Sequence, residues 1–181
     1  MAKTVFSQSA AVVWLLVPLV TNSPAVTQGN PVQTAQKPAH LRAEAADGQG
    51  LIDDAFGRSP TFRELASRLE GSAVVLYVRF ASCRGGTGAC LEYVGTTAGV
   101  TYVRATLNRS NYSPAVRAGL LAHELFHALE IGDARVTSLA EFRRFLVRHG
   151  RESTAGYETD GARAVGRRVE DELIERKIIR H

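Results

Sequence analysis

The chain has 181 residues, which is enough for one domain with its own core but hardly for two. With 45% hydrophobic and 22% charged residues, it has the composition of a globular protein. The net charge is +4, and acidic and basic residues alternate near the C-terminus in RRVEDELIERK (167–177). That alternation is typical of a solvated helix face. No stretch combines basic with aromatic residues, so we expect no nucleic-acid binding.

Residues 1–25 have the features of a secretory signal peptide. One lysine precedes the apolar run AAVVWLLVPLV (10–20), which is short for a membrane span. Ser23 and Ala25 then occupy the small-x-small positions of a cleavage site. We therefore expect a secreted or periplasmic protein that begins near Val26. An uncleaved membrane anchor is the alternative.

Residues 26–50 are rich in Gln, Ala, Gly and Pro and show no apolar periodicity. This composition predicts a flexible linker, with His40 exposed to solvent. The folded domain is expected to span 51–181.

Cys83 and Cys90 stand at the two ends of the glycine-rich segment SCRGGTGAC. No further metal-ligand spacing lies near them, so a zinc knuckle is not indicated. In an oxidising compartment, they are expected to form a disulfide that closes a short loop.

The first elements of the domain are a helix and three strands. In SPTFRELASRLEG (59–71), Thr61 precedes Glu64 by the spacing of a capping box, and Gly71 can end the helix. Strands are predicted at 73–80, at 90–95 and at 100–108, where β-branched and aromatic residues are frequent. Because the connections are short, we expect antiparallel neighbours.

The remainder of the chain is predicted to be helical. Ser113 and Pro114 open a helix that Gly132 can end, and Ser138 opens a second helix that stops at Gly150. A last helix is predicted over 157–179. The fold class is therefore α+β, with an antiparallel or mixed sheet of about three strands and a C-terminal helical part.

The segment LLAHELFHALEIGD (120–133) places His123, Glu124 and His127 in the order H-E-x-x-H. On a helix, positions i and i+4 lie about 40° apart and one turn along, so both imidazoles can hold one metal ion. Glu124 is rotated about 100° from His123. It therefore flanks the ion without binding it and can take a proton from an attacking water.

The alternative is a core helix that carries two histidines by chance. An apolar stripe lies on the side opposite the histidines and consists of Leu121, Leu125, Ala128 and Leu129. The helix can therefore bury one side and still direct both imidazoles into a cleft. This arrangement favours a metal site.

The segment AHELFHALE resembles the zinc-binding helix of the HExxH metallopeptidases, the zincins. The preceding strands resemble the zincin sheet, whose edge strand lines the substrate cleft. The resemblance implies peptide-bond hydrolysis at Zn²⁺, with His123 and His127 as ligands and Glu124 as general base. It is specific over about ten residues and general over 51–181.

Two groups of zincins differ in the third zinc ligand. In the metzincin pattern, Asp133 falls at the ligand position, but Glu130 replaces the glycine whose turn brings that ligand back. In the gluzincin pattern, a glutamate of a later helix is the ligand. The segment GYETDGARAVG (156–166) offers Glu158, with Ala162 at the usual aspartate position.

A helical wheel of that last helix favours Glu158. The core-facing stripe lies within about 60° of Glu158, whereas Asp160 points about 160° away. A carboxylate on a buried stripe is unfavourable unless it is paired or binds a metal. We predict Glu158 as the third ligand, with Asp133 and Asp160 as alternatives. Glu130 is expected either to support the metal site or to be an ordinary exposed acid.

The sequence thus predicts an exported zinc-dependent hydrolase with a peptide or protein substrate. One alternative is a catalytically silent domain of the same shape that binds a metal or a protein partner. Another is a membrane-anchored helper domain. A membrane partner is expected only if the N-terminal segment stays uncleaved, and no motif predicts an oligomeric state.

Overall fold

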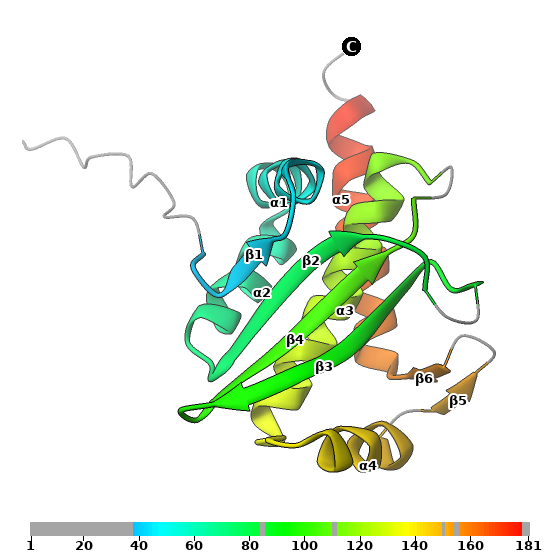
Figure 1. Ribbon diagram of the computed structural model, residues 1–181. Coiled ribbons are helices and arrows are strands. Elements are labelled where there is room, and N and C mark those ends of the chain that lie inside the picture. Colours follow the sequence, from blue (N-terminus) through cyan, green and yellow to red (C-terminus); the bar gives the residue numbers. More distant parts are fainter. Residues whose placement is uncertain (1–37, 84–85, 110–111, 150, 154–155, 179–181) are drawn as a thin grey trace, which may run out of the picture. The chain divides into compact units, whose positions relative to one another are not determined.

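The computed structural model describes residues 38–178, apart from 84–85, 110–111, 150 and 154–155 (Figure 1). The predictions of a signal peptide at 1–25 and of a linker at 26–37 lie outside these residues. No helix in the described part is long and apolar enough to cross a membrane. The elements, in chain order, are β1 (Leu41–Ala43), α1 (Ala46–Arg58), α2 (Pro60–Glu70), β2 (Val74–Phe80), β3 (Ala89–Thr97), β4 (Val100–Leu107), α3 (Pro114–Asp133), α4 (Leu139–His149), β5 (Arg151–Ser153), β6 (Gly156–Glu158) and α5 (Asp160–Ile178).

The described elements form an α+β fold, as predicted, around a mixed sheet in the order β1-β2-β4-β3. β3 and β4 are the antiparallel pair that we expected, whereas β2 is parallel to β4 and not a neighbour of β3. The prediction of antiparallel neighbours is therefore wrong for β2. The connection 81–88 is long enough for β3 to reach the sheet edge. A tight turn at Ala98 and Gly99, with φ of 50° and 77°, then brings β4 back beside β2.

The predicted linker is wrong for residues 41–50, which are folded. Leu41 lies in β1 opposite Leu76 of β2, and α1 begins at Ala46. His40 is only partly exposed: its backbone N–H donates to the carboxylate of Glu70 at 2.9 Å. β1 has three residues, too few to show a strand periodicity, and the glycines of α1 interrupt its apolar pattern.

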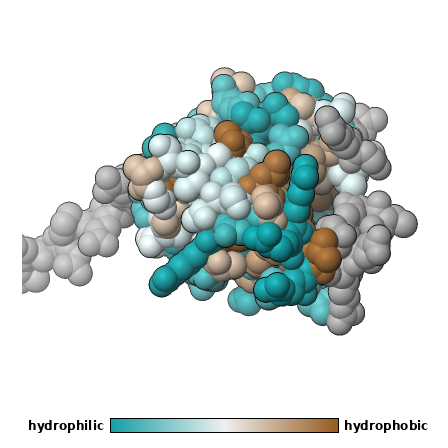
Figure 2. Space-filling view, turned by 60° about the horizontal axis from the view of Figure 1, so that its bottom comes forward, coloured by the Kyte–Doolittle hydropathy of each residue, from teal (hydrophilic) through white to brown (hydrophobic). Residues whose placement is uncertain are grey.

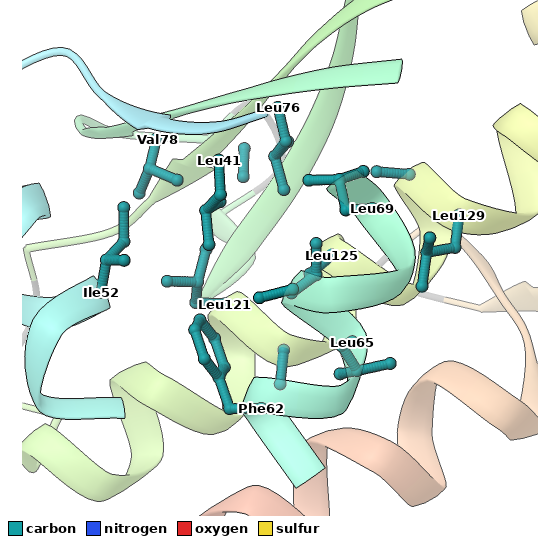
Figure 3. Packing of buried hydrophobic residues seen from close by; sticks show 14 of the residues in the cluster. Leu41, Ile52, Phe62, Leu65, Leu69, Leu76, Val78, Leu121, Leu125 and Leu129 are labelled. Carbon is teal, nitrogen blue, oxygen red and sulfur yellow. The ribbon is translucent and has the colours of Figure 1, made fainter. Parts of the chain in front are cut away.

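The core lies between the sheet and the helices α1, α2 and α3, which cover one of its faces (Figures 1 and 3). The apolar stripe predicted on α3 is buried, with Leu121, Leu125 and Ala128 fully inaccessible to solvent. Figure 3 shows Leu121 and Leu125 pointing toward Phe62 of α2 and toward the sheet. One face of α3 is thus fixed by the core.

α4 and the β5–β6 hairpin follow α3 and lie near the β3 side of the sheet (Figure 1). Figure 2, turned to bring this end forward, shows hydrophilic side chains with small hydrophobic areas between them. Among the residues of α4, Leu139 and Val147 are 46% and 63% exposed. Scattered exposure of this kind is ordinary for a protein surface.

The helix ends follow the predicted capping chemistry with small shifts. α2 is capped by Ser59, whose hydroxyl accepts from the N–H of Phe62 at 2.9 Å, and not by Thr61, because Pro60 occupies the first helical position. Ser113 caps α3 as predicted and accepts from Val116 at 3.2 Å. α3 ends one residue beyond Gly132, at Asp133.

Two further findings concern the C-terminal half and the cysteines. α5 begins at Asp160, so Glu158 ends β6 and does not belong to a helix as predicted. Thr159 caps α5 by accepting from the N–H of Ala162 at 3.2 Å. The predicted disulfide between Cys83 and Cys90 is present and closes a loop of short sequence separation.

α3 and α5 pack against each other through facing glycines. A Cβ added to Gly119 would lie 2.7 Å from the carbonyl oxygen of Gly166, and one added to Gly166 would lie 3.4 Å from the Cβ of His123. Only a residue without a side chain allows backbones to approach this closely. The contact places the start of α5 beside the two histidines of α3.

We predict that Gly119→Ala destabilises the protein by about 1–3 kcal/mol, the scale of overpacking at a close contact. The added methyl group must push α5 away from α3, because backbone and not a flexible side chain faces it. Gly57→Ala is the matched control, since its Cβ would meet no atom within 4 Å and alanine favours the helix. Urea unfolding of both variants measures the difference. Equal stabilities would contradict the tight contact.

Candidate metal centre

The two histidines of the HExxH segment and Glu158 meet on one side of α3. The Nε2 atoms of His123 and His127 are 3.1 Å apart, and the Nε2 of His123 is 3.2 Å from a carboxylate oxygen of Glu158. Each of the three residues offers one ligand atom, and these atoms all lie within 4.8 Å of one another. The structure therefore brings together the three residues that the sequence predicted as metal ligands.

These spacings match the edges of a small coordination shell. Ligands about 2.0–2.1 Å from a tetrahedral zinc ion stand about 3.3 Å from one another. The two short separations, 3.1 and 3.2 Å, are close to that value. Two imidazole nitrogens and one carboxylate oxygen are also a donor set of catalytic zinc, in which the fourth position is left for water or substrate. The residues present thus fit a zinc ion.

Glu158 is placed beside the histidines by a strand and not, as the helical wheel assumed, by a helix. It ends β6, immediately before Thr159 and the first turn of α5. Its side chain is 20% exposed and belongs to no helical stripe. Glu158 joins the two histidines as the prediction expected, but not through the helical stripe given as the reason, which is wrong.

The two alternative third ligands stand apart from this cluster. Asp133, the last residue of α3, is exposed to solvent. Asp160 is 70% exposed and forms an ion pair of 2.8 Å with Arg163. Among the described residues, neither aspartate joins the group formed by the two histidines and Glu158.

Both imidazoles are oriented through a second contact. The Nδ1 of His127 lies 2.7 Å from a carboxylate oxygen of Glu130, one turn further along α3. Because a carboxylate can only accept, Nδ1 carries the hydrogen, and the lone pair of the neutral ring is left on Nε2. The assignment leaves the metal-facing nitrogen of His127 free to bind.

His123 is held by the backbone instead. It forms a hydrogen bond with the backbone of Ala162, the residue that replaces the aspartate of the gluzincin pattern. The backbone carbonyl can orient an imidazole as a carboxylate does. The sequence could not reveal this contact, since backbone groups are present at every position.

Burial controls the protonation of the histidines. Burial, together with the nearby His127, lowers the pKa of His123 to about 4, so this ring is neutral at pH 7. Burial also acts to lower the pKa of His127, but its hydrogen bond to Glu130 and the neighbouring carboxylates outweigh burial and raise that pKa. A metal ion must therefore compete with a proton mainly at His127.

Glu124 is buried beside the three ligand residues. It is 5% exposed, and burial raises its pKa to about 7, with Glu158 adding to the rise and His127 opposing it. A carboxyl group that titrates near neutral pH is well suited to take up and release a proton. Its place on α3, next to His123 and outside the ligand cluster, is the one predicted for the base.

Comparison of the chain with protein-family models, with curated proteins and with solved structures found no match. A fold alone does not determine a function, so the functional argument must come from the site itself. The positions and environments of His123, Glu124, His127 and Glu158 carry that argument.

The buried carboxyl group of Glu124 is expected to make the stability of the fold depend on pH. Between the ordinary pKa of 4.5 and about 7, the folded protein holds a proton on Glu124 that the unfolded chain has released. This group therefore lowers the stability of the metal-free protein as pH rises through that range. Above pH 7, Glu124→Gln is expected to raise the free energy of unfolding by about 2–3 kcal/mol relative to the wild type, and by little below pH 4.5.

Urea unfolding at pH 5 and pH 8.5, in the presence of a chelator, tests this expectation. Glu64→Gln is the control, because it removes one negative charge from the exposed surface of α2. A gain for Glu124→Gln that is the same at both pH values would contradict the assignment of the buried acid.

Proposed function

We propose that the protein is an exported zinc-dependent hydrolase that cleaves peptide bonds, with a centre of the gluzincin type. The observation that carries the proposal is the convergence of His123, His127 and Glu158 beside the buried acid Glu124. The third ligand comes from a segment that follows the intervening helix α4, which is the order expected for a gluzincin-like centre.

The chemistry of the centre follows from its residues. His123, His127 and Glu158 would hold the zinc ion, which supplies a Lewis acid that makes water nucleophilic near neutral pH. Glu124 accepts one proton from the water as its oxygen attacks the carbonyl carbon of the peptide. It then delivers this proton to the amide nitrogen as the C–N bond breaks, leaving an amine and a carboxylic acid, whose own proton passes to the amine or the solvent.

The sheet offers a place for an extended substrate. β3 is an edge strand among the described strands, and it contacts α3. The outer side of an edge strand has unpaired N–H and C=O groups, which can pair with a peptide in extended conformation. We propose that the substrate lies antiparallel or parallel to β3, with its scissile bond at the metal centre.

The proposed location is outside the cytoplasm. The disulfide between Cys83 and Cys90 supports this proposal, because such bonds persist in oxidising compartments. The signal-like segment 1–25 supports it from the sequence.

Substitution of single carboxylates is expected to distinguish the residue that binds zinc from the acidic residues near it. Glu158→Ala should lose zinc on dialysis against a mild chelator, because two histidines alone hold the ion weakly. Asp133→Ala and Asp160→Ala should retain most of it. Glu130→Ala should weaken zinc binding by about 10–100-fold, the scale for a residue that orients a ligand. The zinc content of each variant is measured by mass spectrometry, and circular dichroism checks that each variant is folded. Loss of zinc from Asp133→Ala but not from Glu158→Ala would overturn the ligand set.

Removal of the base should abolish cleavage while keeping the metal. Glu124→Gln retains the size of the side chain and is expected to bind zinc normally, with peptidase activity reduced at least about 100-fold. New amino termini in a mixture of unfolded polypeptides, detected by mass spectrometry, measure the activity, and Glu64→Gln is the charge-matched control. Equal cleavage by wild type and Glu124→Gln would refute the mechanism. A wild type that binds zinc without cleaving would indicate the catalytically silent alternative.

A further inference from the structure

A cavity of about 620 Å³ lies where the parallel strands of the sheet end. Its wall includes Phe80, the last residue of β2, Arg109, which follows β4, and Arg117 in the first turns of α3. α1 closes the opposite side with Asp47, Asp54 and Arg58. The volume is in the range of small-molecule sites, and the carboxyl ends of parallel strands are a common place for them.

Two of the three arginines in the cavity wall are already neutralised. Arg109 forms an ion pair of 2.8 Å with Asp47, and Arg58 forms one of 3.0 Å with Asp54. Both aspartates of the wall are used in these pairs. Among the described residues that line the cavity, Arg117 is therefore the arginine whose charge no aspartate of the wall balances.

The guanidinium of Arg117 packs on an aromatic ring, and its Nε has no hydrogen-bond partner among the described residues. Its guanidinium lies over the ring of Phe80, 5.9 Å from the ring centroid, beside the guanidinium of Arg109 at 5.6 Å. Within the described part of the chain, the buried Nε of Arg117 has no hydrogen-bond partner. A buried N–H without an acceptor is unfavourable by about 1–3 kcal/mol. Because this Nε is buried, a ligand in the cavity reaches Arg117 only at the terminal nitrogens of its guanidinium.

The start of α3 adds to the positive potential at the same place. Pro114, the first residue of this 20-residue helix, also lines the cavity. Ser113 already accepts from the N–H groups of Val116 and Arg117, and Pro114 has no N–H, so it is the helix dipole that favours negative charge here. Arg117 and the helix end thus favour the same kind of ligand.

We infer that this cavity binds a compact organic molecule that carries an oxyanion, either a carboxylate or a phosphate. The oxyanion accepts from the terminal N–H groups of the Arg117 guanidinium near the start of α3. The apolar part of the molecule packs on Phe80 and on Leu51, a buried residue of α1 that lines the same cavity. The two aspartates on the rim hold the other arginines in place and disfavour a second anion.

This site is distinct from the metal centre. None of the residues that line the cavity is His123, His127 or Glu158. Arg117 precedes His123 by six positions, which places them about 9 Å apart along the helix axis and on sides about 120° apart. A ligand in the cavity therefore binds without coordinating the metal, and the inference does not depend on the proposed hydrolase activity.

Titration of the metal-free protein tests the inference, since removal of metal excludes anion binding at the metal centre. The probes are phenyl phosphate and benzoate, and benzyl alcohol is the neutral counterpart. We expect saturable binding of at least one anion, a shift of the Nε–H resonance of Arg117 in the NMR spectrum, and no binding of benzyl alcohol at the same concentration. The probe that binds more tightly distinguishes a phosphate site from a carboxylate site.

Three variants define the role of Arg117. Arg117→Gln should weaken anion binding about tenfold or more, the scale of a charge-assisted hydrogen bond. Arg117→Lys keeps the charge but lacks the planar pair of terminal N–H donors, so it should recover only part of the affinity. Arg68→Gln, on the exposed side of α2, is the control and should bind as the wild type does.

Three results would each overturn the inference. One is unchanged affinity in both Arg117 variants. Another is binding by the wild type without a shift of the Arg117 resonance, and the third is equal binding of benzyl alcohol. The last two results use the wild-type protein alone, so they hold even if a variant fails to fold.

Discussion

The close packing of α3 against α5 is the constraint on which the candidate metal centre depends. Gly119 and Gly166 face each other so closely that a Cβ at either position would collide with the other backbone or press on it. His123 stands one turn after Gly119, and Ala162 stands one turn before Gly166. The glycine contact therefore brings the ring of His123 to the backbone of Ala162, and it sets the start of α5, with Glu158 just before it, at the height of the two imidazoles.

α3 combines two demands that ordinarily exclude each other. One face carries Leu121, Leu125 and Ala128 into the core, with no exposure to solvent. The other face carries His123, Glu124 and His127, and two of these polar residues are themselves more than 90% buried. Burial of an acid such as Glu124 disfavours its charged form and lowers the stability of the fold above neutral pH. Residues that weaken a fold in this way are typical of functional sites.

The fold could be predicted from the sequence where one local signal was strong. The pair Ser113 and Pro114 predicted the start of α3, and β-branched and aromatic residues predicted β4, because capping and strand preference depend on neighbours in the chain. The linker prediction was wrong for β1 and for the start of α1, because three residues and a glycine-rich helix give too little periodicity. β2 pairs with β4 because β3 lies at the edge of the sheet. The position of β3 depends on the whole sheet and not on neighbours in the sequence.

The candidate site shows the same division between local and long-range information. The H-E-x-x-H spacing identified His123, Glu124 and His127 because one helical turn relates them. Glu158 was chosen from a helix that does not include it, yet it lies at the site, because the strand β6 carries it to the end of α5. The role of Glu130 was left open. Glu130 follows His127 by three positions, a spacing at which side chains of a helix meet. That spacing could have predicted the contact between the two side chains.

The charges around the histidines indicate which ligand the centre needs. Glu124, Glu130 and Glu158 surround two imidazoles, and His123 is neutral at pH 7. In the part of the chain that the structure describes, no arginine or lysine forms an ion pair with these three glutamates, although Arg163 stands close enough to affect His123. Burial is the main cause of the raised pKa of Glu124, and the negative charge of the neighbouring Glu158 adds to it. A divalent cation between the imidazoles would supply the missing positive charge. It would also draw the pKa of Glu124 downward, so that the carboxylate form needed to accept a proton becomes available at neutral pH.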